Sequence, residues 1–125
     1  MLNSSDIYNA LNVSSVTSLL STYGSGKALF ADLLLPKDCT ASSSVNFYFI
    51  AAPDSSQLYD EEIFSASCRA KTYGQAIAIG RAVINAINRI SRSGLSIYCT
   101  AGQVLPPADS TDNYNMPVEI RIKKR

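Results

Sequence analysis

The clearest periodic segment of the chain is an apolar stripe that begins just after Thr72. Thr72 and Gln75 have the residue types and spacing of a capping box, and Gly94 is a typical C-terminal stop. The pattern predicts a helix from residue 72 to about residue 93. Its stripe recurs at steps of three and four residues: Tyr73, Ala76, Ile77, Gly80, Val83, Ile84, Ile87 and Ile90. Gly80 costs a helix roughly 1 kcal/mol relative to alanine, which predicts a neighbouring backbone packed closely against it.

Residues 61–71, which precede this helix, alternate between apolar and polar side chains, as a strand with one buried face does. The apolar set is Phe64, Ala66, Cys68 and Ala70, and the polar set is Ser65, Ser67, Arg69 and Lys71. A strand over 118–123 follows the same rule, with Val118, Ile120 and Ile122 pointing inward and the outward set Glu119, Arg121 and Lys123. A polar face of this kind is typical of an antiparallel sheet that is covered on one side only.

Two further segments alternate. In 45–52, the apolar phase holds Val45, Phe47, Phe49 and Ala51, and in 95–101 it holds Leu95, Ile97, Cys99 and Ala101. A strand or extended segment is expected over 28–35, and a long polar loop over 102–117.

The first twenty residues predict two short helices, one capped by Ser4 or Ser5 and one starting at Ser14 or Ser15. Gly24 and Gly26 should end the second. The elements together predict an α+β fold. It has an antiparallel sheet of about four strands with helices packed on one face, and one long helix follows the second clear strand.

The composition fits a single domain spanning residues 1–125. The chain has 125 residues, of which 46% are hydrophobic, enough for an ordinary packed core. No apolar run is long enough to cross a bilayer, so no membrane partner is expected. The N-terminal residues lack the basic and apolar regions of a secretory signal, which predicts synthesis in the cytoplasm.

The residue types present argue against catalysis and against bound metals. The chain has no histidine, which excludes Ser-His-Asp and Cys-His arrangements and makes a zinc site improbable. Its three cysteines, Cys39, Cys68 and Cys99, form no CxxC pair, and we interpret Cys68 and Cys99 as buried small hydrophobic residues. The acidic run 60–62 is interpreted as a solvated loop, and 24–27 lacks the spacing of a phosphate-binding loop. No cofactor is expected.

The charge balance gives little support to nucleic-acid binding. Eleven basic and ten acidic residues leave a formal net charge of +1. Exposed aromatic residues on strands can stack on bases, but Phe47 and Phe49 share the apolar phase and are expected in the core. Tyr48 and Tyr98 are then the outward-facing candidates. A nucleic-acid-binding α+β module is therefore a third interpretation.

The stretch SCRAKTYGQAIAIGRAVINAI resembles the tail completion, or tail terminator, proteins of long-tailed bacteriophages. Residues 69–73 occupy the family's strand-to-helix turn. Ala76, Gly80, Val83 and the pair Ala86–Ile87 follow in its helix register. The N-terminal DIYNALNVSSVTSLLS and the extended ALFADLLLP match the preceding elements, so the resemblance covers most of the chain in order.

This resemblance implies a virion protein of the tail or neck, made in the host cytoplasm, that assembles with itself into a ring, commonly a hexamer. The ring would end tail-tube polymerisation and meet the head-side connector, with DNA passing through its lumen without specific binding. Strand edges of neighbouring copies can pair, and one repeated interface can close into a ring. A head–tail connector or adaptor of the phage neck is the second interpretation.

The resemblance also directs attention to two groups of residues. The polar strand faces are expected to line the lumen or contact a ring neighbour; their residues are Ser65, Ser67, Arg69, Lys71, Glu119, Arg121 and Lys123. The loop 102–117 is expected to contact the tube or the connector through Asp109, Asp112 and Tyr114.

Overall fold

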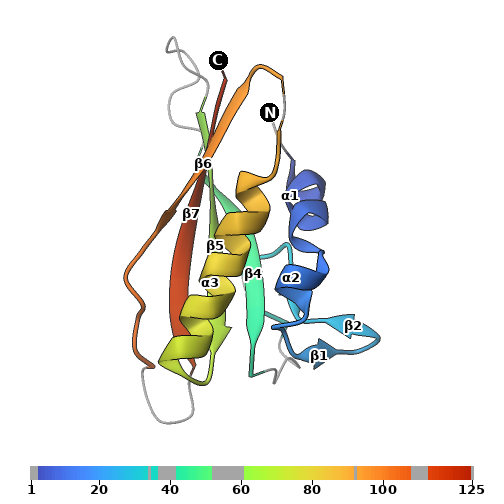
Figure 1. Cartoon of the computed structure of the whole chain (residues 1–125), viewed down its shortest axis with the longest axis vertical. Coiled ribbons are helices and arrows are strands. Elements are labelled where there is room, and N and C mark those ends of the chain that lie inside the picture. Colours follow the sequence, from blue (N-terminus) through green and yellow to red (C-terminus); the bar gives the residue numbers. More distant parts are fainter. Residues whose placement is uncertain are drawn as a thin grey trace.

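The structure, a computed structural model, describes residues 3–33, 35–36, 42–51, 61–91, 93–107 and 113–124. Figure 1 shows a sheet with helices over one of its faces. The helices are α1 (Ser4–Leu11), α2 (Ser14–Thr17) and α3 (Tyr73–Asn88). The strands are β1 (Thr22–Tyr23), β2 (Gly26–Lys27), β3 (Leu29–Phe30), β4 (Ser44–Ala51), β5 (Glu61–Ala70), β6 (Leu95–Ala101) and β7 (Tyr114–Lys124).

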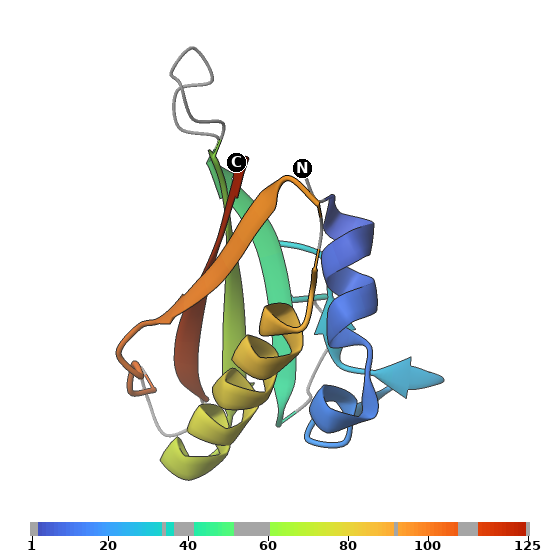
Figure 2. The same cartoon turned by 45° about the horizontal axis from the view of Figure 1, so that its top comes forward.

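The main sheet has five strands in the order β3-β4-β5-β7-β6. Strands β4, β5, β7 and β6 are antiparallel to their neighbours, and the two-residue β3 adds a parallel edge beside Val45 and Asn46. The predicted α+β class and four-stranded antiparallel sheet are therefore confirmed, with β3 as an addition. β1 and β2 form a separate small hairpin, which projects from the side of the molecule away from β6 (Figures 1 and 2).

The core lies between the helices and one face of the sheet (Figure 2). Helix α3 packs on β5, β6 and β7, and α1 and α2 pack beside α3. The residues that α3 buries are Ala76, Ile79, Gly80, Val83, Ala86 and Ile87. The sequence stripe included most of this face, but it missed Ile79 and Ala86 and wrongly included Tyr73, which is 57% exposed.

Gly80 lies directly against the side chain of Met116 on β7. A Cβ atom added at Gly80 would collide with the Met116 sulfur. The predicted close approach is confirmed, but the neighbouring group is a side chain and not a backbone segment. Because Met116 is itself buried, its side chain occupies the space that any larger residue at position 80 would need.

The ends of the long helix are only partly as predicted. The hydroxyl of Thr72 accepts a hydrogen bond from the Gln75 amide at 3.2 Å, as expected of an N-cap. The helix ends at Asn88, five residues before the predicted end. The amides of Arg89 and Ile90 donate to carbonyls three residues back, and this tightening closes the last turn. Gly94, with φ of +79°, then turns the chain into β6.

The N-terminal helices also differ in detail from the prediction. Asn3, and not Ser4 or Ser5, caps α1: its side chain accepts from the Asp6 amide at 2.9 Å, and Asp6 accepts from the Asn3 amide at 3.0 Å. This reciprocal pair is a full capping box. Helix α2 ends at Thr17, before the glycines, which belong to the β1–β2 hairpin.

Strand β7 begins at Tyr114, four residues earlier than the alternation predicted. Residues 114–117 find hydrogen-bonding partners on both sides, because β5 continues beside them to Ala70 and the amide and carbonyl of Leu105 bond to Asn115. The predicted 102–117 loop is therefore shorter. In β4, Phe47 is buried as predicted, but Phe49 is 50% exposed, and that prediction is wrong. It lies beside a register shift, where β5 is its only paired strand among the described residues.

Candidate interaction surface on the open face of the sheet

The face of the sheet turned away from the helices carries alternate residues of β5 and β7. Ser65 lies opposite Glu119, Ile63 opposite Arg121, and Glu61 opposite Lys123. The apolar partners Phe64, Ala66 and Cys68 point to the helices and are buried. The strict two-residue period of the strands thus collects the polar side chains on one surface, here called the open face.

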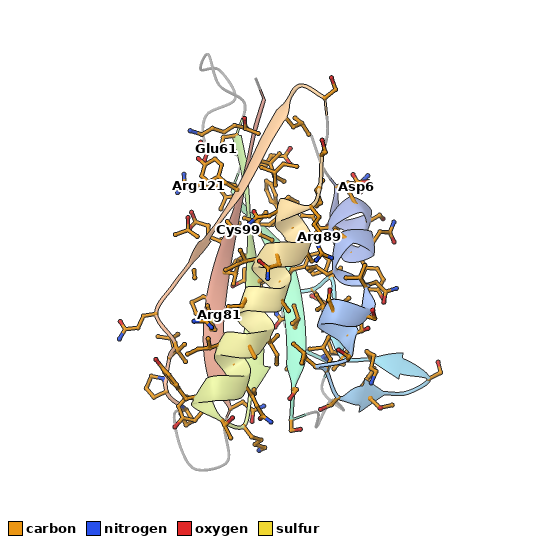
Figure 3. All side chains as sticks on the ribbon, in the orientation of Figure 1. Asp6, Glu61, Arg81, Arg89, Cys99 and Arg121 are labelled. Atoms are coloured by element: carbon orange, nitrogen blue, oxygen red, sulfur yellow. The ribbon has the colours of Figure 1, made fainter. Side chains whose placement is uncertain are left out.

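At one end of the open face, four charged side chains form a cluster, which we call the charged cluster. Arg121 donates from Nη1 to Glu61 Oε1 at 2.8 Å and from Nε to Glu119. Lys123 Nζ lies 3.9 Å from Glu61 Oε2 and 5.9 Å from the centroid of the Tyr98 ring. Figure 3 labels Glu61 and Arg121 near the end of the sheet where the C-terminus lies.

The charged cluster is electrically balanced, because its two cations and two carboxylates neutralise one another. The hydrogen bond that Arg121 donates to Glu119, followed by the one it donates to Glu61, raises the pKa of Arg121, so its guanidinium stays charged. A self-paired group of this kind attracts polyanions only weakly. The surface can therefore lie close to DNA or protein without holding either by net charge.

The opposite end of the open face contains polar atoms that lack partners. Ser44, Arg69 and Asn115 lie in one row across β4, β5 and β7. Ser44 Oγ, Arg69 Nε and Asn115 Oδ1 are buried and have no hydrogen-bond partner among the described residues, and the same holds for Asn46 Oδ1 in the next row. Asn46 is oriented by its Nδ2, which donates to the carbonyls of Asp32 and Leu33 at 3.1 Å each. Unpaired buried polar atoms are rare and costly, and they often mark functional surfaces.

The structure brings six of the seven predicted strand-face residues onto this surface. The exception is Lys71, which lies in the turn after β5. Ser65 and Ser67 are on the open face as predicted but are only 9% and 5% exposed, because small side chains lie below the tops of their longer neighbours. A shallow cavity of about 210 Å³ lies over this part of the face, lined by Ser65, Thr100, Ala101, Gly102, Pro117 and Glu119.

The three residues predicted to form a contact loop are not brought together on a described loop. Asp109 and Asp112 lie outside the described residues. Tyr114 does not belong to a loop: it starts β7, and its ring packs edge-on against Tyr73 at a centroid distance of 6.2 Å. The reason is the early start of β7, which the polar sequence around Asn115 and Pro117 concealed.

One member of the charged cluster, Glu61, was not predicted from the sequence, nor was the contact of Lys123 with the Tyr98 ring. Glu61 was interpreted as part of a solvated acidic run, although it shares the odd-numbered phase of Ser65, Ser67 and Arg69. This shared phase is the signal in the sequence that places Glu61 on the open face. The contact between Tyr98 and Lys123 depends on the pairing of β6 with β7 and had no local signal.

Both described cysteines are free thiols on the helix side of the sheet. Burial raises the pKa of Cys68 to about 12 and that of Cys99 to about 11, from an ordinary value of 9.0. Cys68 is fully buried and Cys99 half-buried, as the prediction of small hydrophobic residues required. Cys39 lies outside the described residues.

These thiols make the stability of the chain sensitive to alkaline pH. The unfolded thiols lose their protons first as the pH rises above about 9, so the free energy of unfolding should fall between about pH 9 and pH 12. Cys68→Ala should flatten that fall, as measured by urea unfolding at several pH values. In the native chain at pH 8.5, iodoacetamide should modify Cys68 more slowly than Cys99. Equal and rapid labelling of both thiols would contradict this prediction.

Among the residues that the structure describes, no three side chains of the His, Cys, Asp and Glu types come together as a metal site would require. None of the described helices combines the length and the apolar character needed to span a membrane.

The fold is shared with a chain in a virus-like particle. A solved structure titled "Virion of native gene transfer agent (GTA) particle" contains a chain that aligns with a TM-score of 0.63 and 16% identity. The alignment covers 94% of this chain and 90% of that chain. At this identity the similarity establishes a common α+β fold over nearly the full length of both chains. No protein-family model matches the sequence, and no curated protein matches it significantly.

Proposed function

We propose that the chain is a virion structural protein that caps the tail tube of a phage-like particle as an oligomeric ring. The single observation that supports this most is the fold, which nearly the whole chain shares with a chain of a gene transfer agent virion. The resemblance of residues 67–87 to tail terminators points independently to the same class of assembly. In this role the ring ends tube polymerisation and offers its other side to the head-side connector.

The open face suits the lumen of such a ring, or the contact with a ring neighbour. Its charged cluster is balanced, so DNA can pass without being retained. Its other end holds Ser44, Arg69 and Asn115, whose buried polar atoms lack hydrogen-bond partners among the described residues. The chain needs no catalytic group or cofactor for this role, and we propose that it is not an enzyme.

Two alternatives compete with this proposal. A head–tail connector of the neck would also be part of a virion, and the match to a virion chain is equally compatible with it. A nucleic-acid-binding module is less well supported. Of its two candidate tyrosines, Tyr48 is half-buried and Tyr98 lies beneath Lys123 beside a neutral cluster.

Charge reversal on the open face tests the surface assignment. Arg69→Glu should impair ring formation or alter tail length, because it replaces a donor with a carboxylate beside the unpaired oxygens of Ser44 and Asn115. The matched control is Arg81→Glu, which makes the same charge change on the exposed side of α3 (Figure 3). Oligomer mass and tail length in electron micrographs are the measurements. The assignment should be dropped if Arg69→Glu and Arg121→Glu both leave ring formation and tail length at wild-type values.

The ring itself is tested by the mass of the purified chain, alone and with tube protein. A defined oligomer in either preparation supports the proposal. A chain that stays monomeric in both, but binds oligonucleotides with steep salt dependence, supports the nucleic-acid alternative.

A further inference from the structure

The two lateral edges of the sheet are open for pairing over similar lengths. At one edge, no described residue pairs with the outer side of β6 over 97–101. At the other edge, β3 covers β4 only at Val45 and Asn46, which leaves 47–51 without a partner on that side among the described residues. Each edge therefore presents about five residues of backbone N–H and C=O groups that can accept another strand.

Among the described residues, the only protective feature of either edge is the register shift between Phe49 and Ala51 in β4, which leaves 47–49 as the regular part of that edge. Residues 97–101 are Ile-Tyr-Cys-Thr-Ala and residues 47–51 are Phe-Tyr-Phe-Ile-Ala, without a charge or a proline in either segment. Natural proteins usually protect an edge with lysine, proline, an inward charge or a covering segment. Half of Phe49 and Ile50 is also exposed at the β4 edge. Edges left in this state are suited to a partner strand.

The directions of the two edges are complementary. β4 runs opposite to β5, β5 opposite to β7, and β7 opposite to β6, so β4 and β6 point in opposite directions. When two copies stand side by side in the same orientation, β6 of one meets β4 of the next as an antiparallel pair. The open faces of both copies then lie on the same side of one continuous sheet.

We propose that the occupant of each edge is a second copy of this chain, with residues 97–101 of one copy paired antiparallel to residues 47–51 of the next. This inference rests on the proposed ring and specifies its interface. A two-fold pairing of β6 with β6 would leave the β4 edge of both copies unpaired, whereas the head-to-tail pairing occupies both edges of every copy. Repetition of this one contact closes a ring with every open face directed the same way.

Disulfide trapping distinguishes these arrangements. The background is Cys39→Ser, Cys68→Ala, Cys99→Ser, so that every disulfide comes from an introduced thiol. Tyr48→Cys places a thiol at the β4 edge, and Tyr98→Cys or Thr100→Cys places one at the β6 edge. All three positions are on the open-face side of the sheet, and Tyr98 and Thr100 cover two adjacent registers. Cross-strand neighbours are close enough for a disulfide.

The expected result is specific to the head-to-tail pairing. A mixture of the Tyr48→Cys chain with one of the two β6 single variants should give disulfide-linked dimers on oxidation with copper phenanthroline. The matching double variant should give a ladder that ends at the ring. Each single variant alone should stay uncross-linked. The double variant Asn9→Cys, Thr100→Cys is the matched control, because Asn9 is exposed on α1, in the helix layer and not on an edge strand, and it should give no ladder.

Other outcomes overturn the inference in distinguishable ways. If a β6 single variant cross-links with itself and stops at the dimer, the two-fold pairing is correct. If mass measurement shows a ring but no mixture cross-links, the edge pairing is wrong and the proposed function stands. If the chain forms no oligomer, alone or in particles, both proposals fail together. A melting temperature close to that of the cysteine-free background chain establishes that each variant is folded.

Discussion

Replacing Phe47 by alanine is expected to destabilise the fold by about 3 to 5 kcal/mol, the usual cost of removing a buried phenylalanine ring. Phe47 is 1% exposed and lies in the middle of β4, opposite Ala66 on β5. Small residues opposite it cannot fill the cavity left by the ring. Urea unfolding followed by circular dichroism measures the change, and a loss of this size would leave a chain of ordinary stability only marginally folded.

Phe49 provides the matched control for this prediction, since it is the same residue type on the same strand and the same face. Because Phe49 is 50% exposed, Phe49→Ala should cost about 1 kcal/mol, mainly through lost contact with Phe64 at 5.5 Å between ring centroids. Equal losses of unfolding free energy for Phe47→Ala and Phe49→Ala would show that Phe49 is buried in the isolated chain. Such a result would contradict the description of the β4 edge as open.

Gly80→Leu is the second substitution with a large expected effect. The added side chain would collide with Met116 Sδ and Cε, which occupy the space that a Cβ atom at position 80 needs. Overpacking a core typically costs about 1 to 3 kcal/mol, and here α3 would have to move away from β7 as a whole. After the gain of roughly 1 kcal/mol in helix propensity, we expect a net loss of up to about 2 kcal/mol.

Two further variants separate steric conflict from helix propensity. Gly74→Leu makes the same change in the first turn of α3, where no atom lies within 4 Å of an added Cβ, and it should be neutral or slightly stabilising. Met116→Ala in the Gly80→Leu background should recover part of the loss by vacating the space. If Gly74→Leu destabilises as much as Gly80→Leu, the close packing of α3 on β7 is not the cause.

Local periodicity was sufficient to predict the class of fold. The alternation around Phe64–Ala70 and Val118–Ile122 placed the strands, and the stripe from Ala76 to Ile87 placed α3, because one face of each element is buried against the others. What the sequence could not show depends on partners distant along the chain. The polar start of β7 forms because β5 and Leu105 supply hydrogen-bonding partners. Phe49 is exposed next to a register shift in the pairing of β4 with β5, which the alternation of the sequence does not show.

The surface was predictable to a similar degree. Strand parity placed Ser65, Arg69 and Arg121 on one face, since side chains alternate along a strand irrespective of its neighbours. Parity does not reveal which charges neutralise one another. The ion pair between Arg121 and Glu61 joins residues that are sixty positions apart, and it requires the β5–β7 register. The burial of Ser65 and Ser67 depends in the same way on longer side chains from neighbouring strands.

The proposed role in tail assembly is tested most directly by electron microscopy of particles produced without this chain. A protein that caps the tail tube limits its growth, so its loss should give tails of uncontrolled, excessive length that are not joined to heads. Supplying the wild-type chain in trans should restore tails of uniform length. Particles that lack the chain but still carry tails of normal length, joined to heads, would contradict the account, and normal-length tails without heads would assign the chain to the connector instead.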